Sequence, residues 1–146
     1  MTSIANDEVN HLQTVTRVLA RRGGRLTKSH RNRYAAELRG LVRAGSGNAE
    51  IADRLMVSAL IEARSCERFQ LLAGECPDKE LARLYAGLYH SEAGHYRVFL
   101  KLARELPDPP DIDRRWRGML EAEAAIIQNQ PPGPTMHSGL AASTDR

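Results

Sequence analysis

Apolar residues recur along the chain at intervals of three and four positions, whereas the alternation typical of β-strands is hard to find. This spacing predicts helices over residues 4–22, 32–43, 49–73, 78–105 and 113–128. Glycines or proline-rich runs separate these segments, and Asn48 is expected to cap the third helix. The pattern favours an all-α bundle with one long connection, comprising a helical domain over residues 1–130 and an irregular tail over 131–146.

Three of the predicted helices carry acidic or imidazole side chains on otherwise apolar faces. Glu8 and His11 share one such stripe, Glu62 interrupts a second, and Glu92 and His95 lie within a third. A carboxylate that faces a core is costly unless it is paired or binds a metal. Because residues three apart on a helix project to the same side, each Glu-x-x-His pair can offer both of its ligand groups to one ion. The pattern predicts a carboxylate-histidine site for iron or manganese.

Other interpretations of these polar residues stay open. The first Glu-x-x-His pair lies near the start of the chain and could be solvated, and the second could bond to neighbouring side chains. Glu67 is expected to pair with Arg64 or Arg68 rather than bind metal. Glu123 falls on the apolar stripe of the last helix, where a substitute ligand is possible and a flanking surface acid is preferred.

The net charge of +3 conceals a basic segment between Arg17 and Arg43, which holds nine Lys or Arg residues and one acid, Glu37. Such a segment either tracks a phosphate backbone or forms a solvated charged surface. The residues that we select as candidate RNA-binding residues are Arg21, Arg22, Arg25, Lys28, Arg31 and Arg33.

The sequence predicts a cytoplasmic location. No apolar run approaches the length that a membrane span requires, and the first residues lack the pattern of an export signal. Cys66 and Cys76 do not form a Cys-x-x-Cys motif, which favours reduced thiols. We expect a soluble, cytoplasmic protein that does not contact a membrane.

Four segments together resemble the tRNA 2-methylthio-N6-isopentenyladenosine hydroxylase (MiaE) family. They are Asn32–Tyr34, the run Asp53–Phe69 that contains Ile-Glu-Ala-Arg-Ser-Cys-Glu-Arg-Phe, Leu88–Tyr96, and Met136–Gly139. The resemblance implies a ferritin-like, non-haem di-iron monooxygenase. Such an enzyme uses O₂ and reducing equivalents to hydroxylate the isopentenyl group of a hypermodified adenosine next to the tRNA anticodon.

The resemblance assigns two iron ions to Glu8, His11, Glu62, Glu92 and His95, with tRNA as substrate and an external reductase or ferredoxin as electron donor. It also implies a further helix before the first one here. We therefore expect a ferritin-like four-helix bundle that is apparently truncated at its N-terminus and has an extra C-terminal helix. An exposed apolar face would then favour a homo-oligomer.

Two rival functions remain at this stage. One is a ferritin-like iron-binding protein without hydroxylase activity, and the other is an inactive, truncated remnant. For the hydroxylase, apolar residues near the ligands are expected to line the substrate pocket, namely Ala59, Phe69, Leu88 and Phe99.

Overall fold

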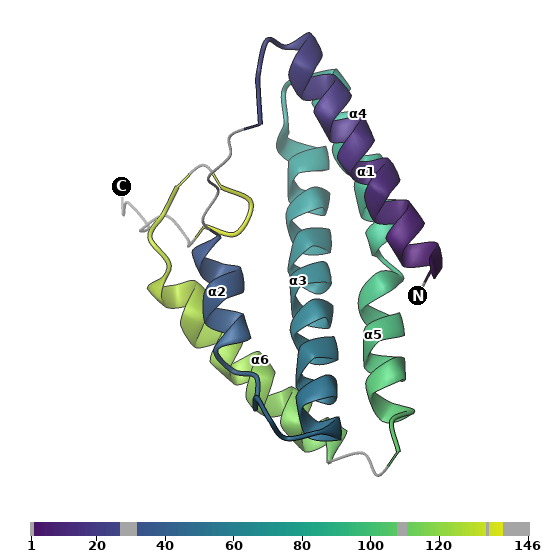
Figure 1. Cartoon of the computed structure of the whole chain (residues 1–146). Coiled ribbons are helices and arrows are strands. Elements are labelled where there is room, and N and C mark those ends of the chain that lie inside the picture. Colours follow the sequence, from purple (N-terminus) through teal and green to yellow (C-terminus); the bar gives the residue numbers. More distant parts are fainter. Residues whose placement is uncertain (1, 27–31, 108–110, 134, 139–146) are drawn as a thin grey trace. The chain divides into compact units, whose positions relative to one another are not determined.

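The regular elements of the protein are helices (Figure 1). A computed structural model describes residues 2–26, 32–107, 111–133 and 135–138. Its contacts divide the chain into two compact units, Met1–Arg31 and Asn32–Arg146. In the described ranges the helices are α1 (Thr2–Arg21), α2 (Arg33–Arg39), α3 (Asn48–Glu75), α4 (Lys79–Glu92), α5 (His95–Arg104) and α6 (Ile112–Asn129). None of these helices is long and apolar enough to cross a membrane.

The first unit contains α1, which agrees with the predicted helix over residues 4–22. The helix ends because Gly23 adopts a left-handed conformation, with φ of 74°, that a residue with a Cβ rarely adopts. The amide of Gly24 then donates to the carbonyl of Leu19 at 2.9 Å, which satisfies an acceptor that the helix end would otherwise leave free.

In the second unit α3 is the central helix. It packs along α4 and α5 on one side, and it also contacts α2 and α6 (Figure 1). The core between these helices contains large side chains that are almost completely buried, among them Tyr34, Leu38, Met56, Leu60 and Met119. Helix α2 contributes an apolar face to this core, because Tyr34 and Leu38 are buried, and Leu41, just after the helix, packs against the same core.

The single helix predicted over residues 78–105 is in fact two helices. Helix α4 ends at Glu92 and α5 begins at His95, with Ala93 and Gly94 between them. Glycine in a helix interior costs about 1 kcal/mol relative to alanine, so Gly94 weakens the continuous helix at this point. The apolar periodicity continues across the break, and for that reason the sequence pattern did not reveal it.

The predicted boundaries of two other helices are also wrong. Helix α2 stops at Arg39, four residues before the predicted end, and Asn32 caps its start by accepting from the amide of Ala35 at 3.1 Å. Asn48 does not cap α3 and is itself the first helical residue. Its side-chain amide instead donates to the carbonyl of Pro107 at 2.6 Å, which ties the start of α3 to the end of the α5 segment.

A buried carboxylate joins three segments of the second unit. Asp53 on α3 is completely buried and accepts from both Nε and Nη2 of Arg43, each at 2.8 Å, and from the same two nitrogens of Arg115, each at 3.0 Å. Arg115 on α6 also donates to the carbonyl of Leu41 at 2.6 Å. Burial raises the pKa of Asp53, but the hydrogen bonds from Arg43 and Arg115 outweigh it and lower the pKa to about 2. The carboxylate therefore stays ionised and links α3 to α6 and to the segment after α2.

Candidate metal centre

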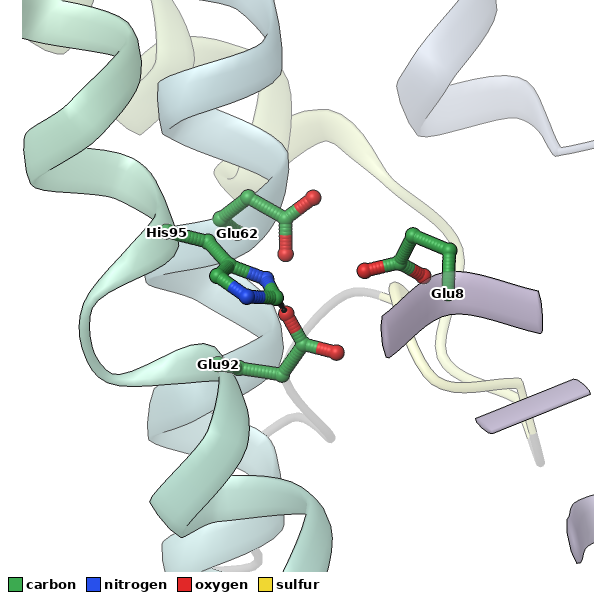
Figure 2. Close-up of side chains that lie close together, drawn as sticks. All are labelled: Glu8, Glu62, Glu92 and His95. Carbon is green, nitrogen blue, oxygen red and sulfur yellow. Dashed lines mark hydrogen bonds and ion pairs between the residues drawn. The ribbon is translucent and has the colours of Figure 1, made fainter. Parts of the chain in front are cut away.

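Three of the predicted ligands come together in the second unit from three helices. Glu62 lies in the middle of α3, Glu92 is the last residue of α4, and His95 is the first residue of α5. Figure 2 shows the two carboxylates and the imidazole gathered in one small volume. One donor atom from each of the three residues lies within 4.8 Å of the donor atoms of the other two. This spacing is compatible with binding a metal ion.

Glu92 and His95 are the most deeply buried members of this cluster. Their side chains are 6% and 8% exposed, and Nδ1 of His95 lies 2.7 Å from Oε2 of Glu92 (Figure 2). The break at Ala93 and Gly94 thus falls between these two predicted ligands, and the hydrogen bond spans it. Ionisable groups this deep in a protein are normally compensated by a partner or by a metal.

The surroundings of the cluster are apolar and contain one thiol. Ala59 and Leu88, two residues predicted to line the pocket, are buried. Cys66 lies one turn beyond Glu62 on α3, and its pKa is raised by burial and then by the charges of Glu92 and Glu62. The thiol therefore stays protonated at neutral pH, so the donors of the cluster are carboxylate oxygens and imidazole nitrogens. Iron and manganese accept this donor set readily.

The other two predicted ligands lie on α1, in the first unit. Nδ1 of His11 is 3.8 Å from Oε1 of Glu8, so the two side chains project from the same side of the helix as the Glu-x-x-His spacing requires. The side chain of Glu8 is 50% exposed and that of His11 is 18% exposed. The pair is thus more open to solvent than Glu92 and His95.

Four of the six candidate RNA-binding residues are exposed in the structure. Arg21, Arg22 and Arg25 lie at or just after the end of α1, and Arg33 begins α2, where its Nε is 2.8 Å from Oε1 of Glu37. Lys28 and Arg31 lie outside the described residues.

Glu67 and Glu123, which are not among the predicted ligands, each contact another side chain. Glu67 forms the expected ion pair with Arg64. The preference for Glu123 as a surface acid was wrong, because its carboxylate accepts a hydrogen bond from the hydroxyl of Tyr34 and burial raises its pKa. The position of Glu123 on the apolar stripe of α6 was the only signal of this role, since Tyr34 lies 89 residues earlier in the chain.

Comparison with known proteins identifies relatives over nearly the whole chain. The model of the family described as "tRNA-(MS[2]IO[6]A)-hydroxylase (MiaE)" matches residues 1–138. The tRNA 2-(methylsulfanyl)-N(6)-isopentenyladenosine(37) hydroxylase of Pseudomonas putida (strain KT2440) is 43% identical over 140 residues, which cover 96% of this chain and 67% of that protein. The hydroxylase of the same name from Salmonella typhimurium (strain LT2) is 35% identical over 143 residues, 98% of this chain and 52% of that protein. The chain thus spans about two thirds and about half of their lengths.

A solved structure supports the fold. "Protein 43 with aldehyde deformylating oxygenase activity" from Synechococcus matches with a TM-score of 0.86 and 31% identity, over 98% of this chain and 72% of that one. The predicted all-α, ferritin-like fold class is confirmed. The predicted family resemblance is confirmed as well, since its relatives are enzymes named as tRNA hydroxylases.

Proposed function

Because the chain belongs to the tRNA-(MS[2]IO[6]A)-hydroxylase (MiaE) family, we propose that it hydroxylates the isopentenyl group of 2-methylthio-N6-isopentenyladenosine next to the anticodon of tRNA. The observation that carries the proposal is the gathering of Glu62, Glu92 and His95 in an apolar interior. Hydroxylation of a C–H bond of the isopentenyl group requires an oxidant, and no amino-acid side chain supplies one.

The donor set fits iron. Glu62, Glu92 and His95 would hold it, because two carboxylates and one imidazole match the ligands of carboxylate-bridged metal sites in helical bundles. When bound, iron supplies the capacity to activate O₂ with electrons from an external reductase or ferredoxin. The chain itself orients the ligands through the Glu92–His95 hydrogen bond and keeps water away from them by burying both side chains.

We extend the proposal to Glu8 and His11 as further ligands, so that the complete centre holds two iron ions. Support comes from the Glu-x-x-His spacing of these two residues on α1 and from the observed placement of both side chains on one side of that helix. The exposed arginines at the end of α1 and at Arg33 then serve tRNA binding, since positive side chains near a substrate RNA neutralise its phosphates.

The direct test is nucleoside analysis. Purified protein loaded with ferrous iron is incubated with O₂, a reductase system and tRNA that contains 2-methylthio-N6-isopentenyladenosine. We expect mass spectrometry of the digested tRNA to show the modified nucleoside with one additional oxygen atom. Omission of O₂ should abolish the product. An iron-loaded protein that leaves the nucleoside unchanged under these conditions would instead support the ferritin-like iron protein without hydroxylase activity.

Iron binding should occur in two phases. Glu8 is half exposed, whereas Glu92 and His95 are buried, so water competes more effectively for the ion held by α1. We expect a ferrous titration to fill one site first, and the His11→Ala variant to lose mainly the weaker phase. A His11→Ala variant that loses both phases together would show that the two sites do not differ in this way.

A further inference from the structure

Three of the four segments that carry the family resemblance meet at a second cluster, away from the predicted ligands. The ring of Tyr34, at the start of α2, stacks on the imidazole of His137 with centroids 4.8 Å apart and an angle of 15° between the planes. On α3, Nη2 of Arg68 donates to the carbonyl of Ser138 at 3.1 Å. The segment after α6 thus contacts both α2 and the Ile61–Phe69 run of α3.

This cluster contains buried nitrogens that lack acceptors. Arg64 and Arg68 are one turn apart on α3, and the side chain of Arg64 is only 9% exposed. Within the described part of the chain, Nε and Nη2 of Arg64, Nε of Arg68 and Nδ1 of His137 are buried with no hydrogen-bond partner. Each such group destabilises the fold if it stays unpaired. A ligand rich in acceptor oxygens would satisfy several of them at once.

The charges of the cluster favour an anionic ligand. Both guanidinium groups are permanently charged, and like charges four residues apart on a helix repel each other. Glu67 pairs with Arg64, but its side chain is 56% exposed. Glu123 accepts its hydrogen bond from the hydroxyl of Tyr34, and burial raises the pKa of its carboxyl. Glu67 therefore compensates the charges of the two arginines only in part.

A pocket of about 430 Å³ adjoins this cluster. Arg68 and Ser138 line it together with Leu72, Tyr85 and Met136, and Glu75 contributes a carboxylate to its wall. The volume falls within the range typical of small-molecule sites. Tyr85 stacks on Phe69 with ring centroids 6.2 Å apart, so the pocket that Arg68 lines also has an aromatic wall. Aromatic rings beside a cation are a common means of binding a nucleotide.

We propose that Arg64, Arg68 and His137 form a binding site for a phosphate group of a nucleotide, whose base occupies the pocket lined by Tyr85 and Met136. Phosphate matches the forked donors of arginine and accepts from several nitrogens at once. His137 contributes a hydrogen bond rather than a charge. Its pKa is lowered to about 4 by burial and by the nearby charges of Arg64 and Arg68, so the imidazole is neutral at neutral pH.

The biological identity of the nucleotide rests on the proposed function, because an RNA hydroxylase must hold a nucleotide near its metal-binding residues. Tyr85 precedes Glu92 by seven residues on α4, and Phe69 follows Glu62 by seven residues on α3. Seven residues of helix span roughly 10 Å. The stacked pair of Phe69 and Tyr85 therefore lies about two helical turns from both carboxylates, along the same pair of packed helices, and Tyr85 also lines the pocket.

The test measures the binding of three probes to the full chain: adenosine and adenosine 5′-monophosphate by calorimetry, and an unmodified anticodon stem-loop RNA by fluorescence anisotropy. We expect Arg68→Gln to weaken the binding of a phosphate-containing probe about tenfold or more, because a charge-assisted hydrogen bond is lost. The matched control is Arg83→Gln, which removes the same charge from an exposed position on α4 and should change affinity less than about twofold.

The two phosphate-containing probes, adenosine 5′-monophosphate and the stem-loop RNA, distinguish the source of the phosphate. An effect on the stem-loop assigns the site to the RNA backbone, and an effect confined to the monophosphate assigns it to a free nucleotide. The proposal is overturned if Arg68→Gln and Arg83→Gln give the same affinities for both probes. Arg64→Gln is the second variant, with its folding checked by circular dichroism, and Arg68→Lys should recover part of the affinity.

These measurements separate the site from the activity. Hydroxylation that persists while Arg68→Gln leaves all affinities unchanged would refute the phosphate site and preserve the proposed function. If hydroxylation is absent but the phosphate-containing probes still bind in an Arg68-dependent way, the proposed function is refuted and the phosphate site is preserved.

Discussion

The Glu92→Gln variant is expected to lose hydroxylation by about a hundredfold or more and to bind less iron. Glutamine preserves the size of the side chain and can keep a hydrogen bond to His95, but its neutral amide is a poor ligand for a hard cation. Loss of a group that merely orients a metal ligand costs about 10–100-fold, and loss of a ligand should cost at least as much. Iron content by elemental analysis and product formation in tRNA are the two measurements.

Glu121→Gln is the matched control for this variant. Glu121 is exposed on α6, so the same substitution there should leave iron content and product formation unchanged. If Glu92→Gln keeps both properties at the level of the unsubstituted protein, Glu92 is not a ligand and the assignment of the centre is wrong. If only the iron content persists, Glu92 acts in catalysis rather than in metal binding.

The Asp53→Asn variant is expected to lose about 3 kcal/mol of stability. Removing one partner of a buried ion pair costs about 3–5 kcal/mol, and the lower end applies because the side chains of Arg43 and Arg115 are 40% and 29% exposed. Chemical denaturation, followed by helical circular dichroism, measures the change. The control is Asp113→Asn, which removes an exposed ion pair with Arg104 and should change stability little. Equal losses in the two variants would contradict the role of Asp53.

The stability difference between the unsubstituted protein and Asp53→Asn should depend on pH. The pKa of Asp53 is lowered to about 2 in the folded state, whereas an aspartate in the unfolded chain has a pKa of about 3.9. The unfolded state therefore binds the proton more tightly, and the stabilisation from Asp53 is fully present above about pH 5. It is lost as the pH falls from about 4 toward 2. The difference in unfolding free energy between the unsubstituted protein and Asp53→Asn should shrink over that window and stay constant above it.

The helices and three members of the carboxylate-histidine cluster followed from the sequence because both depend on local spacing. Apolar residues at three- and four-residue intervals need a neighbouring surface, which fixed the fold class. Glu62, Glu92 and His95 stood out because they interrupt those stripes, and the structure brings them together. The ion pair of Glu67 with Arg64 followed from the same spacing rule.

Features that depend on distant segments could not be predicted in this way. Nothing near Glu123 in the sequence indicates that Tyr34 will donate to it, because the partners belong to α6 and α2. The cap proposed at Asn48 failed for a similar reason, since the carbonyl of Pro107 binds that side chain instead. Such contacts are chosen by tertiary packing, which overrides local preference when the two compete.

The break between α4 and α5 is a joint with one predicted metal ligand on each side, Glu92 and His95. An ion held by Glu92 and His95 would act as a clamp across Ala93 and Gly94, adding its coordination bonds to one hydrogen bond that now spans the gap. Local opening of this joint would then depend on iron supply, because an iron-free chain would lack the additional stabilisation that the ion gives to this region.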